Sequence, residues 1–353
     1  MSNSLTPLLK SLITASGLSG FETPVRSLIQ AAWEPLADEV SVSRVGSLHA
    51  LRRGQAPEPR PSILLAAHMD AIGFMVTAVV DGFLRFTRIG GHDPRVLPGQ
   101  AVTVFGRQPL PGYIVQPPAR LLPAHAQEGT LPMEFLWIDV GLSPAEVARM
   151  ARVGDVVAFA QPPLDTASET LCGHSLDNRA SVVVVTHCLE LLHSRPHAWD
   201  VLAVATVQEE ETMLGAVSSA YQLRPSLAVA IDVTHAAGPG SPAHRTYPLG
   251  KGPALGWGPN VHPRLFKDFK HIAESQEIPF SIEVMPHHSG TDAYGMQVAA
   301  EGIPTMVLSI PLRYMHTPVE MVSLKDIRRL GRLLAEFIAQ LTPDYMTAFS
   351  WED

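Results

Sequence analysis

The chain has 353 residues, a formal net charge of -8 and a hydrophobic content of 46%. This composition indicates a globular chain with enough apolar material for one large domain or two. No stretch is dense in Lys and Arg, so nucleic acid is not an expected partner. No apolar run approaches the length that spans a bilayer, and a membrane partner is not expected either.

The N-terminal segment and the cysteines bear on the compartment. Residues 1–17 contain Lys10 within a short apolar stretch and lack a small-residue cleavage site, which predicts an amphipathic helix rather than a signal peptide. Cys172 and Cys188 are too few for a disulfide framework, although one disulfide stays open. The sequence therefore predicts a cytoplasmic protein.

The pattern along the chain changes twice. "TPVRSLIQAAWEPLAD" predicts a helix over 23–38 and "SILLA" predicts a buried strand over 62–66, as at the start of an α/β domain. From about 74 to 165, short apolar or alternating runs follow one another between Gly and Pro turns, which predicts a small β-barrel or sandwich. After about 170 the alternation of helices and strands returns. A β-rich block inserted into one α/β domain explains both changes.

Individual elements can be predicted on both sides of the second change. The inserted block has strand patterns at "FMVTAVV", "FLRFTRI", "AVTVFG", "GYIVQ", "EFLWIDV" and "DVVAFA", and a capping-box helix at "SPAEVARM". The later part has helices at "SVVVVTHCLELLHS", "PRLFKDFKHIAESQE" and from Ser323, and strands at "VLAVATV", "LAVAI", "FSIEV" and "TMVLSI". We expect a mixed, mostly parallel sheet with helices on both faces, formed by residues 1–73 and 166–353, with residues 74–165 as the insert.

Polar residues follow the buried strands of the α/β part. Active sites of open α/β sheets lie outside the carboxyl ends of the strands, so side chains at these ends are expected to converge. A further acid lies in the turn before the helix that begins near residue 180. The candidates are His68 and Asp70 after the strand at 62–66, Asp177 in that turn, Glu209 and Glu210, Asp232, and His316.

Each candidate also has an ordinary structural interpretation. A lone His-x-Asp pair is often a surface ion pair, an acid before a helix is often an N-cap, and the acidic run at 209–211 is often a solvated turn. An isolated Asp or His at a strand end is often a loop cap or a structural side chain. The shared location favours a common site. Three further histidines lie near these motifs and are interpreted as supporting or unrelated residues: His174, His287 and His288.

The set of donors indicates the chemistry. Two histidines and four or five carboxylates without a thiolate suit Zn²⁺, Co²⁺ or Mn²⁺, and a two-metal site is the natural use of so many acids. Residues two apart on a strand share a face, so Asp70 can orient the His68 imidazole. Asp177 has two oxygens that can bridge two cations. Of Glu209 and Glu210, one can ligate and the other can hold a proton.

The segments that contain these residues resemble a known family as a set. They occur in order over nearly the whole chain: "AAHMDAIGFMV", "IGGHDPRVLPGQAVTVFG", "SLDNRA", "VQEEETMLGA", "AIDVTHA", "GKGPALGWGPN", "SGTDA" and "SIPLRYMHTPVE". Together they resemble the dinuclear metallo-aminopeptidases of the glutamyl and deblocking aminopeptidase type, the tetrahedral aminopeptidases, whose members often assemble as dodecamers.

The resemblance implies a metal-dependent aminopeptidase that hydrolyses the N-terminal residue of peptides through a metal-bridging hydroxide. It implies two divalent ions per chain, Zn²⁺ or alternatively Co²⁺ or Mn²⁺. By this resemblance His68 and Asp232 hold one ion, Glu210 and His316 hold the other, and Asp177 bridges them.

The resemblance also gives roles to the remaining candidates and to the insert. Glu209 would be the general base and Asp70 the acid that orients a ligand. Residues 1–73 and 166–353 would form the catalytic domain and residues 74–165 a dimerisation domain. A dimer-based homo-oligomer is therefore expected, with the choice between dimer and dodecamer left open, as is the preferred N-terminal residue of the peptide substrates.

One departure from the family pattern affects the acidic run. The family usually has a small apolar residue and a glycine after the glutamate pair, whereas this chain has Glu211 and Thr212 there. Counting back from Gly215 favours Glu209 as base and Glu210 as ligand. The alternative for the Glu211 carboxylate is to face the substrate amine.

Three other functions compete with this interpretation. A related metallo-carboxypeptidase or deacylase would, by resemblance, have its insert after the Glu-Glu segment, whereas here the insert lies between Asp70 and Asp177. A glycoside hydrolase would use two carboxylates and leave the histidines idle. A non-catalytic assembly protein would have lost ligands, and every expected ligand is present.

Overall fold

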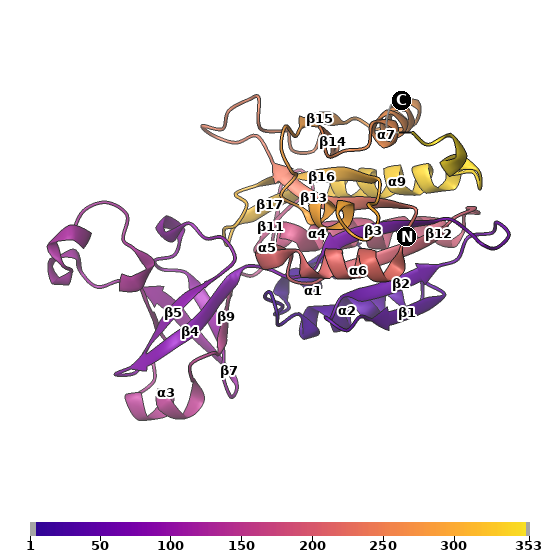
Figure 1. Ribbon diagram of the computed structural model, residues 1–353. Coiled ribbons are helices and arrows are strands. Elements are labelled where there is room, and N and C mark those ends of the chain that lie inside the picture. Colours follow the sequence, from indigo (N-terminus) through magenta and orange to yellow (C-terminus); the bar gives the residue numbers. More distant parts are fainter. Residues whose placement is uncertain (1–4, 351–353) are drawn as a thin grey trace.

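A large mixed sheet and a separate closed barrel contain the strands of this protein (Figure 1). The computed structural model describes residues 5–350, so residues 1–4 of the predicted N-terminal helix lie outside the described part. The predicted fold class, an α/β fold with an inserted small barrel, is confirmed. Within residues 5–350 no helix is long and apolar enough to cross a membrane.

The strands of the main sheet come from both sides of the insert. Across the sheet they are β1 (Glu39–Val42), β2 (Leu48–Arg52), β12 (Asp200–Thr206), β3 (Ser62–His68), β13 (Leu227–His235), β16 (Thr305–Arg313), β17 (Glu320–Ser323), β11 (Thr170–Gly173) and β10 (Leu164–Thr166), with β14 (Ala254–Trp257) on β16 and β15 (Ser281–Val284) on β14. The four central strands, β12, β3, β13 and β16, are parallel.

Antiparallel strands extend the sheet on both sides of this parallel centre. The strands predicted from the apolar runs are all present. The hairpin of β1 and β2 and the short strands β10, β11, β14 and β17 were not predicted. These strands have three to five residues each, and β1 and β10 lie largely exposed. Strands of this length carry little apolar periodicity, which explains the omission.

Helices cover both faces of the sheet (Figure 1). One layer contains α1 (Leu5–Thr14), α2 (Thr23–Trp33), α4 (Leu176–His193) and α9 (Leu324–Gln340), and α7 (Pro263–Ser275) contacts α9 and β14. On the other face α6 (Leu214–Leu223) contacts α8 (Asp292–Gln297) and β12. The short helix α5 (Glu209–Thr212) follows β12 directly.

The centre of the hydrophobic core is α4. Its run from Val182 to Val185 is completely buried, because the helix lies between the sheet and α1, α2 and α9. A helix that is apolar on all sides is typical of such a buried position. The indole of Trp33 on α2 donates to the Thr186 hydroxyl of α4 at 2.9 Å, so the one polar atom of this large side chain is satisfied.

The inserted barrel is built from the six runs that predicted strands. Around the barrel they are β4 (Gly73–Val80), β5 (Phe83–Ile89), β8 (Trp137–Asp139), β7 (Pro109–Val115), β6 (Ala101–Phe105) and β9 (Val156–Phe159). The helix α3 (Pro144–Met150) has the predicted capping box between Ser143 and Glu146. Short 3-10 helices complete the chain at η1 (Pro94–Val96), η2 (Ala119–Leu121), η3 (Ala124–Ala126), η4 (Met133–Phe135) and η5 (Tyr345–Ala348).

Candidate metal centre

The predicted site residues come together at the carboxyl ends of the parallel strands. His68 is the last residue of β3, and Asp232 lies near the end of the neighbouring β13. Glu209 and Glu210 begin α5, immediately after β12. The two remaining residues come from connections: Asp177 lies in the first turn of α4, and His316 follows β16. These residues are up to 248 positions apart in sequence (316 - 68) and form one group.

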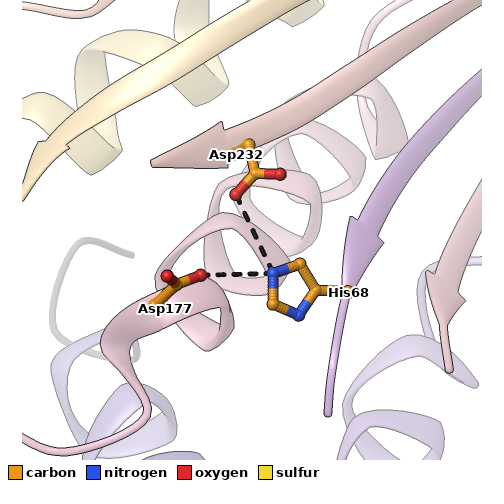
Figure 2. A group of neighbouring side chains, drawn as sticks. All are labelled: His68, Asp177 and Asp232. Atoms are coloured by element: carbon orange, nitrogen blue, oxygen red, sulfur yellow. Dashed lines mark ion pairs between the residues drawn. The ribbon is translucent and has the colours of Figure 1, made fainter. Parts of the chain in front are cut away.

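Asp177 lies between the two histidines and presents a different oxygen to each. Its Oδ1 is 3.2 Å from His68 Nε2, and its Oδ2 is 3.3 Å from His316 Nε2. Asp232 Oδ1 lies 3.8 Å from the same nitrogen of His68 (Figure 2). Glu210 Oε2 lies 3.4 Å from His316 Nε2. The side chains therefore form two groups with metal-ligand spacing, His68–Asp177–Asp232 and Asp177–Glu210–His316, which share Asp177.

Asp70 is fully buried and organises both sides of this arrangement. The ring nitrogen Nδ1 of His68 lies 3.2 Å from the Asp70 backbone carbonyl and 3.5 Å from its Oδ1, which directs Nε2 towards Asp177. The Asp70 carboxylate also accepts the backbone N–H groups of Glu209 at 3.0 Å and Glu210 at 3.2 Å, and the hydroxyl of Ser19. One carboxylate thus positions a histidine and the start of α5 together.

Glu320 is a buried residue of this centre that was not among the predicted site residues. Its Oε2 accepts the backbone N–H of Leu176 at 2.7 Å and of Asp177 at 3.2 Å, and its Oε1 accepts the N–H of His316 at 2.9 Å. Glu320 therefore holds the shared aspartate and the second histidine in place. The signal available in the sequence was an acid four residues after His316, in the segment "HTPVE".

Three residues in or next to the site have a left-handed backbone although none is a glycine. Ser175, Gln208 and His316 have φ values of 59°, 56° and 60°. Such conformations are disfavoured for L residues and persist where the surroundings hold them in place. Here they redirect the chain just before Asp177 and just before Glu209, so that side chains from turns point at the ends of the strands.

The electrostatics show a surplus of buried negative charge. Burial, together with the neighbouring acids Asp232, Asp292 and Glu210, raises the pKa of Glu209 to about 10, against the lowering effect of His68. Burial also raises the pKa values of Asp232 and Glu210. Positive charge at this position would remove the cost of ionising these acids.

The histidines and the shared aspartate stabilise one another's charged forms. Burial alone would lower the pKa of His316, yet its contacts with Asp177 and Glu210 raise it to about 11. Burial alone would raise the pKa of Asp177, yet its contacts with His316 and His68 lower it. Both shifts show that the carboxylates of Asp177 and Glu210 favour positive charge between them.

The donor set fits two divalent cations. Glu210 Oε1 is buried and has no hydrogen-bond partner, which is costly for a carboxylate oxygen unless a ligand engages it. The donors are imidazole nitrogens and carboxylate oxygens, the set that suits Zn²⁺, Co²⁺ or Mn²⁺. Glu209 is in neither ligand group, although its Oε2 lies 3.7 Å from His68 Nε2.

The three consecutive glutamates point in different directions. Glu210 lies in the His316 group, and Glu209 lies beside His68, which fits the register that makes Glu210 the ligand. Glu211 Oε1 accepts the backbone N–H of Gly90 at 2.6 Å and so connects α5 to the loop that follows β5 of the barrel. In that loop a Cβ on Gly91 would lie 3.1 Å from His316 Nδ1, so the barrel approaches the centre closely.

A pocket of about 490 Å³ opens at this centre and contains all the predicted ligands in its lining. His174 is buried beside the Ser175 hydroxyl at 2.8 Å, burial lowers its pKa to about 3, and it does not line the pocket. His287 and His288 are exposed and also lie outside the lining. The sequence missed the buried Asp292, which accepts the Thr206 hydroxyl and adds to the negative charge around Glu209.

A parallel sheet with histidines and carboxylates gathered at its carboxyl edge is the arrangement of a metal-dependent hydrolase. The profile of the M42 glutamyl aminopeptidase family matches residues 46–333, and the chain belongs to this family. Membership makes it a hydrolase of the metal-dependent aminopeptidase class, as the resemblance implied.

Similar proteins agree with this assignment over nearly the whole chain. A lysyl aminopeptidase from Pyrococcus furiosus is 34% identical and covers 95% of this chain and 97% of its own. A TET aminopeptidase from the marine sediment archaeon Thaumarchaeota archaeon SCGC AB-539-E09 has a TM-score of 0.93 at 30% identity, covering 99% of this chain and 100% of its own. The Pyrococcus horikoshii TET1 peptidase, which can assemble into a tetrahedron or a large octahedral shell, has a TM-score of 0.83 at 29% identity, covering 96% and 100%.

Proposed function

We propose that this protein removes the N-terminal residue of peptides with two divalent cations, Zn²⁺ in the first instance and Co²⁺ or Mn²⁺ as alternatives. The observation that carries the proposal is Asp177, which presents one oxygen to each histidine. His68 and Asp232 would hold one cation, Glu210 and His316 the other, and Asp177 both.

Side chains of this protein would transfer the proton and position the metal ligands. Bound cations at such a centre supply the Lewis acidity that lowers the pKa of water and polarises a carbonyl. Glu209 lies beside this position without being part of either ligand group, so it accepts the proton of the attacking water and delivers it to the nitrogen of the leaving amine. Asp70 and Glu320 hold the ligands in the geometry that this transfer needs.

The acidic pocket favours a substrate that carries a free α-ammonium group. Glu209, Glu210 and Glu211 all line the pocket, and among the described residues that line it there is no Lys or Arg. An N-acetylated peptide or a carbohydrate offers no positive charge to these acids. A glycoside hydrolase would in addition leave His68 and His316 without a role.

The test measures metal content and substrate class together. Mass spectrometry of the purified protein should find about two transition-metal ions per chain, and chelation should abolish turnover until a divalent metal is restored. A panel of aminoacyl chromogenic amides should be cleaved, whereas the N-acetylated form of each should not. Cleavage of the acetylated forms would indicate a deacylase or an endopeptidase, and turnover by the metal-free protein would refute the proposed centre.

We further propose that residues 74–165 are a dimerisation domain attached to a catalytic domain of residues 1–73 and 166–353. The outer wall of the barrel exposes large apolar side chains, including Tyr113 at 59% and Phe83 at 42%. A shallow, largely apolar depression of about 480 Å³ lies beside Tyr113, between β7 and β6. Exposed apolar surface of this kind is typical of an interface.

Assembly and compartment follow from this proposal as further expectations. The P. horikoshii TET1 peptidase forms closed shells, and a homo-oligomer built from dimers, up to a dodecamer, is the corresponding state for this chain. Enclosure would restrict access to peptides and exclude folded proteins. Both cysteines are free, which suits the reducing cytoplasm that we propose as its compartment.

A further inference from the structure

The wall of the pocket beyond the candidate ligands contains a carboxylate that the proposed mechanism does not use. Glu283 lies on β15, lines the same pocket as His68 and Glu209, and belongs to neither group of metal ligands. Its Oε1 accepts the hydroxyl of Thr234 at 2.5 Å. Its Oε2 is buried and has no hydrogen-bond partner.

The Glu283 carboxylate is largely buried, and its pKa reflects its surroundings. Burial raises its pKa, while the hydroxyls of Thr234 and Ser309 act in the opposite direction and stabilise the ionised form. No Lys or Arg of the described lining accompanies it. An unpaired buried carboxylate oxygen is costly, and a positively charged ligand that donates a hydrogen bond would remove that cost.

The position of Glu283 along the sheet indicates which part of a substrate it meets. Its partner Thr234 lies two residues beyond Asp232 on β13, and both line the pocket. Residues two apart on a strand point to the same face and lie about 7 Å apart. Because the scissile carbonyl must lie at the candidate ligands, a carboxylate that is bound to Thr234 and lies outside both ligand groups is placed to meet the first side chain of the substrate.

The rest of the wall suits the stem of a long side chain. Met213, Met315 and Val233 supply apolar surface in the same pocket. The side chains of Lys and Arg combine an aliphatic stem with a terminal cation, and they bury the stem when the charge finds a partner. A Glu or Asp side chain would instead meet uncompensated carboxylates.

We propose that this pocket selects peptides whose N-terminal residue is Lys or Arg, and that Glu283 is the residue that binds the cation of that side chain. The inference rests on the proposed aminopeptidase function and names its substrate class.

The test compares kcat/KM for the chromogenic amides of Lys, Arg, Leu and Glu. The wild-type enzyme with its metals should cleave the Lys and Arg amides faster than the Leu amide and cleave the Glu amide least. Glu283→Gln keeps the size of the side chain and removes the charge, so the Lys-to-Leu ratio of kcat/KM should fall roughly 10- to 100-fold. Glu301→Gln removes an exposed charge outside the pocket and should leave that ratio as in the wild type.

A second measurement uses the wild-type enzyme alone and holds if the variant fails to fold. Free lysine and norleucine share a four-carbon stem and differ in the terminal ammonium. Lysine should inhibit hydrolysis of the Leu amide about tenfold more strongly than norleucine. Equal inhibition, a wild-type preference for Leu or Glu amides, or an unchanged ratio in a folded, metal-loaded Glu283→Gln enzyme would overturn the proposal.

Failure of this inference is distinct from failure of the proposed function. If the Leu or Glu amide is cleaved in a metal-dependent way without a preference for Lys and Arg, the proposed aminopeptidase function is supported. The proposed role of Glu283 is then refuted. If no aminoacyl amide is cleaved by the metal-loaded enzyme, both are refuted.

Discussion

The α/β domain buries many charged side chains at one edge of its sheet, whereas the barrel buries almost none. His68, Asp70 and Asp232 are each no more than 6% exposed and lie within one cluster. In the barrel, over residues 73–159, all of which the structure describes, Asp155 is the one buried polar or charged side chain. Its core is instead closed by aromatic rings, with Phe74 packed edge-on against Phe86 and Phe159.

This difference separates two uses of a sheet. Closing a barrel satisfies its edges and leaves a dry core, so the residues of that core can be explained by stability alone. Burying five acids around two histidines is costly unless ligands compensate the charge. The contrast indicates that the buried acids at the carboxyl edge of the α/β sheet destabilise the fold and are explained by a binding site. The core of the barrel contains no comparable group of charges.

The largest expected effect is at Asp177. Asp177→Asn keeps the size of the side chain and removes the anion that both histidine groups share. The metal content per chain should fall. Turnover should fall with it, by more than the roughly 10²-fold loss expected for a catalytic base alone. Metal analysis and kcat on an aminoacyl amide provide the measurement.

Asp326→Asn is a matched control for that change. Asp326 is fully buried and accepts the N–H groups of Gly250 and Gly252, and it lies outside both ligand groups. Its substitution should lower the thermal stability and leave the metal content in place. An Asp177→Asn enzyme with two metals and a normal rate would reduce Asp177 to a structural residue of the first turn of α4.

The next effect separates the base from the ligands. Glu209→Gln should retain both metals and lose turnover by on the order of 10²-fold or more, because the amide cannot take up the proton of the attacking water. Metal analysis beside single-turnover kinetics distinguishes the two roles. Glu211→Gln, which keeps an acceptor for the Gly90 N–H, should cause a much smaller loss. Loss of one metal in Glu209→Gln would mean that Glu209, and not Glu210, is the ligand.

A smaller effect is expected at Glu320, which acts through Asp177 and His316. Glu320→Gln offers one acceptor in place of two, so one set of its backbone contacts must be lost. Metal affinity should weaken roughly 10- to 100-fold, as for other groups that position ligands, while saturating metal restores most of kcat. Metal titration monitored by activity measures the shift. An unchanged titration midpoint would show that Glu320 serves stability alone.

The smallest effect on chemistry is expected in the barrel. Tyr113→Glu places a charge on the exposed apolar wall and should lower the mass measured by light scattering while the protein stays folded. Turnover of small aminoacyl amides should change by about twofold or less, because surface substitutions away from a site have small effects. If the wild-type protein is a monomer at micromolar concentration, the barrel is not a dimerisation domain and would have to act as a lid over the substrate.

The sequence by itself was sufficient for the outline of both regions. Apolar runs located the parallel strands and the six strands of the barrel, because period and length of such runs report burial directly. The general rule for the carboxyl edge of a parallel sheet then gathered residues as distant as His68 and His316 into one predicted site. The chemistry of the residues also predicted that one of Glu209 and Glu210 is a base and the other a ligand. It did not decide which residue has which role.

Only the tertiary structure decided how those residues meet. Glu320 lies 144 positions from Leu176, yet its carboxylate positions the turn that presents Asp177. The directions of Glu209, Glu210 and Glu211 depend on Asp70 and on the barrel backbone at Gly90, neither of which is near them in sequence. Glu283 reaches the pocket from β15, which pairs with β14, and none of the sequence motifs includes it. Such contacts depend on side-chain distances between separate elements, and a pattern of residues along one chain does not contain those distances.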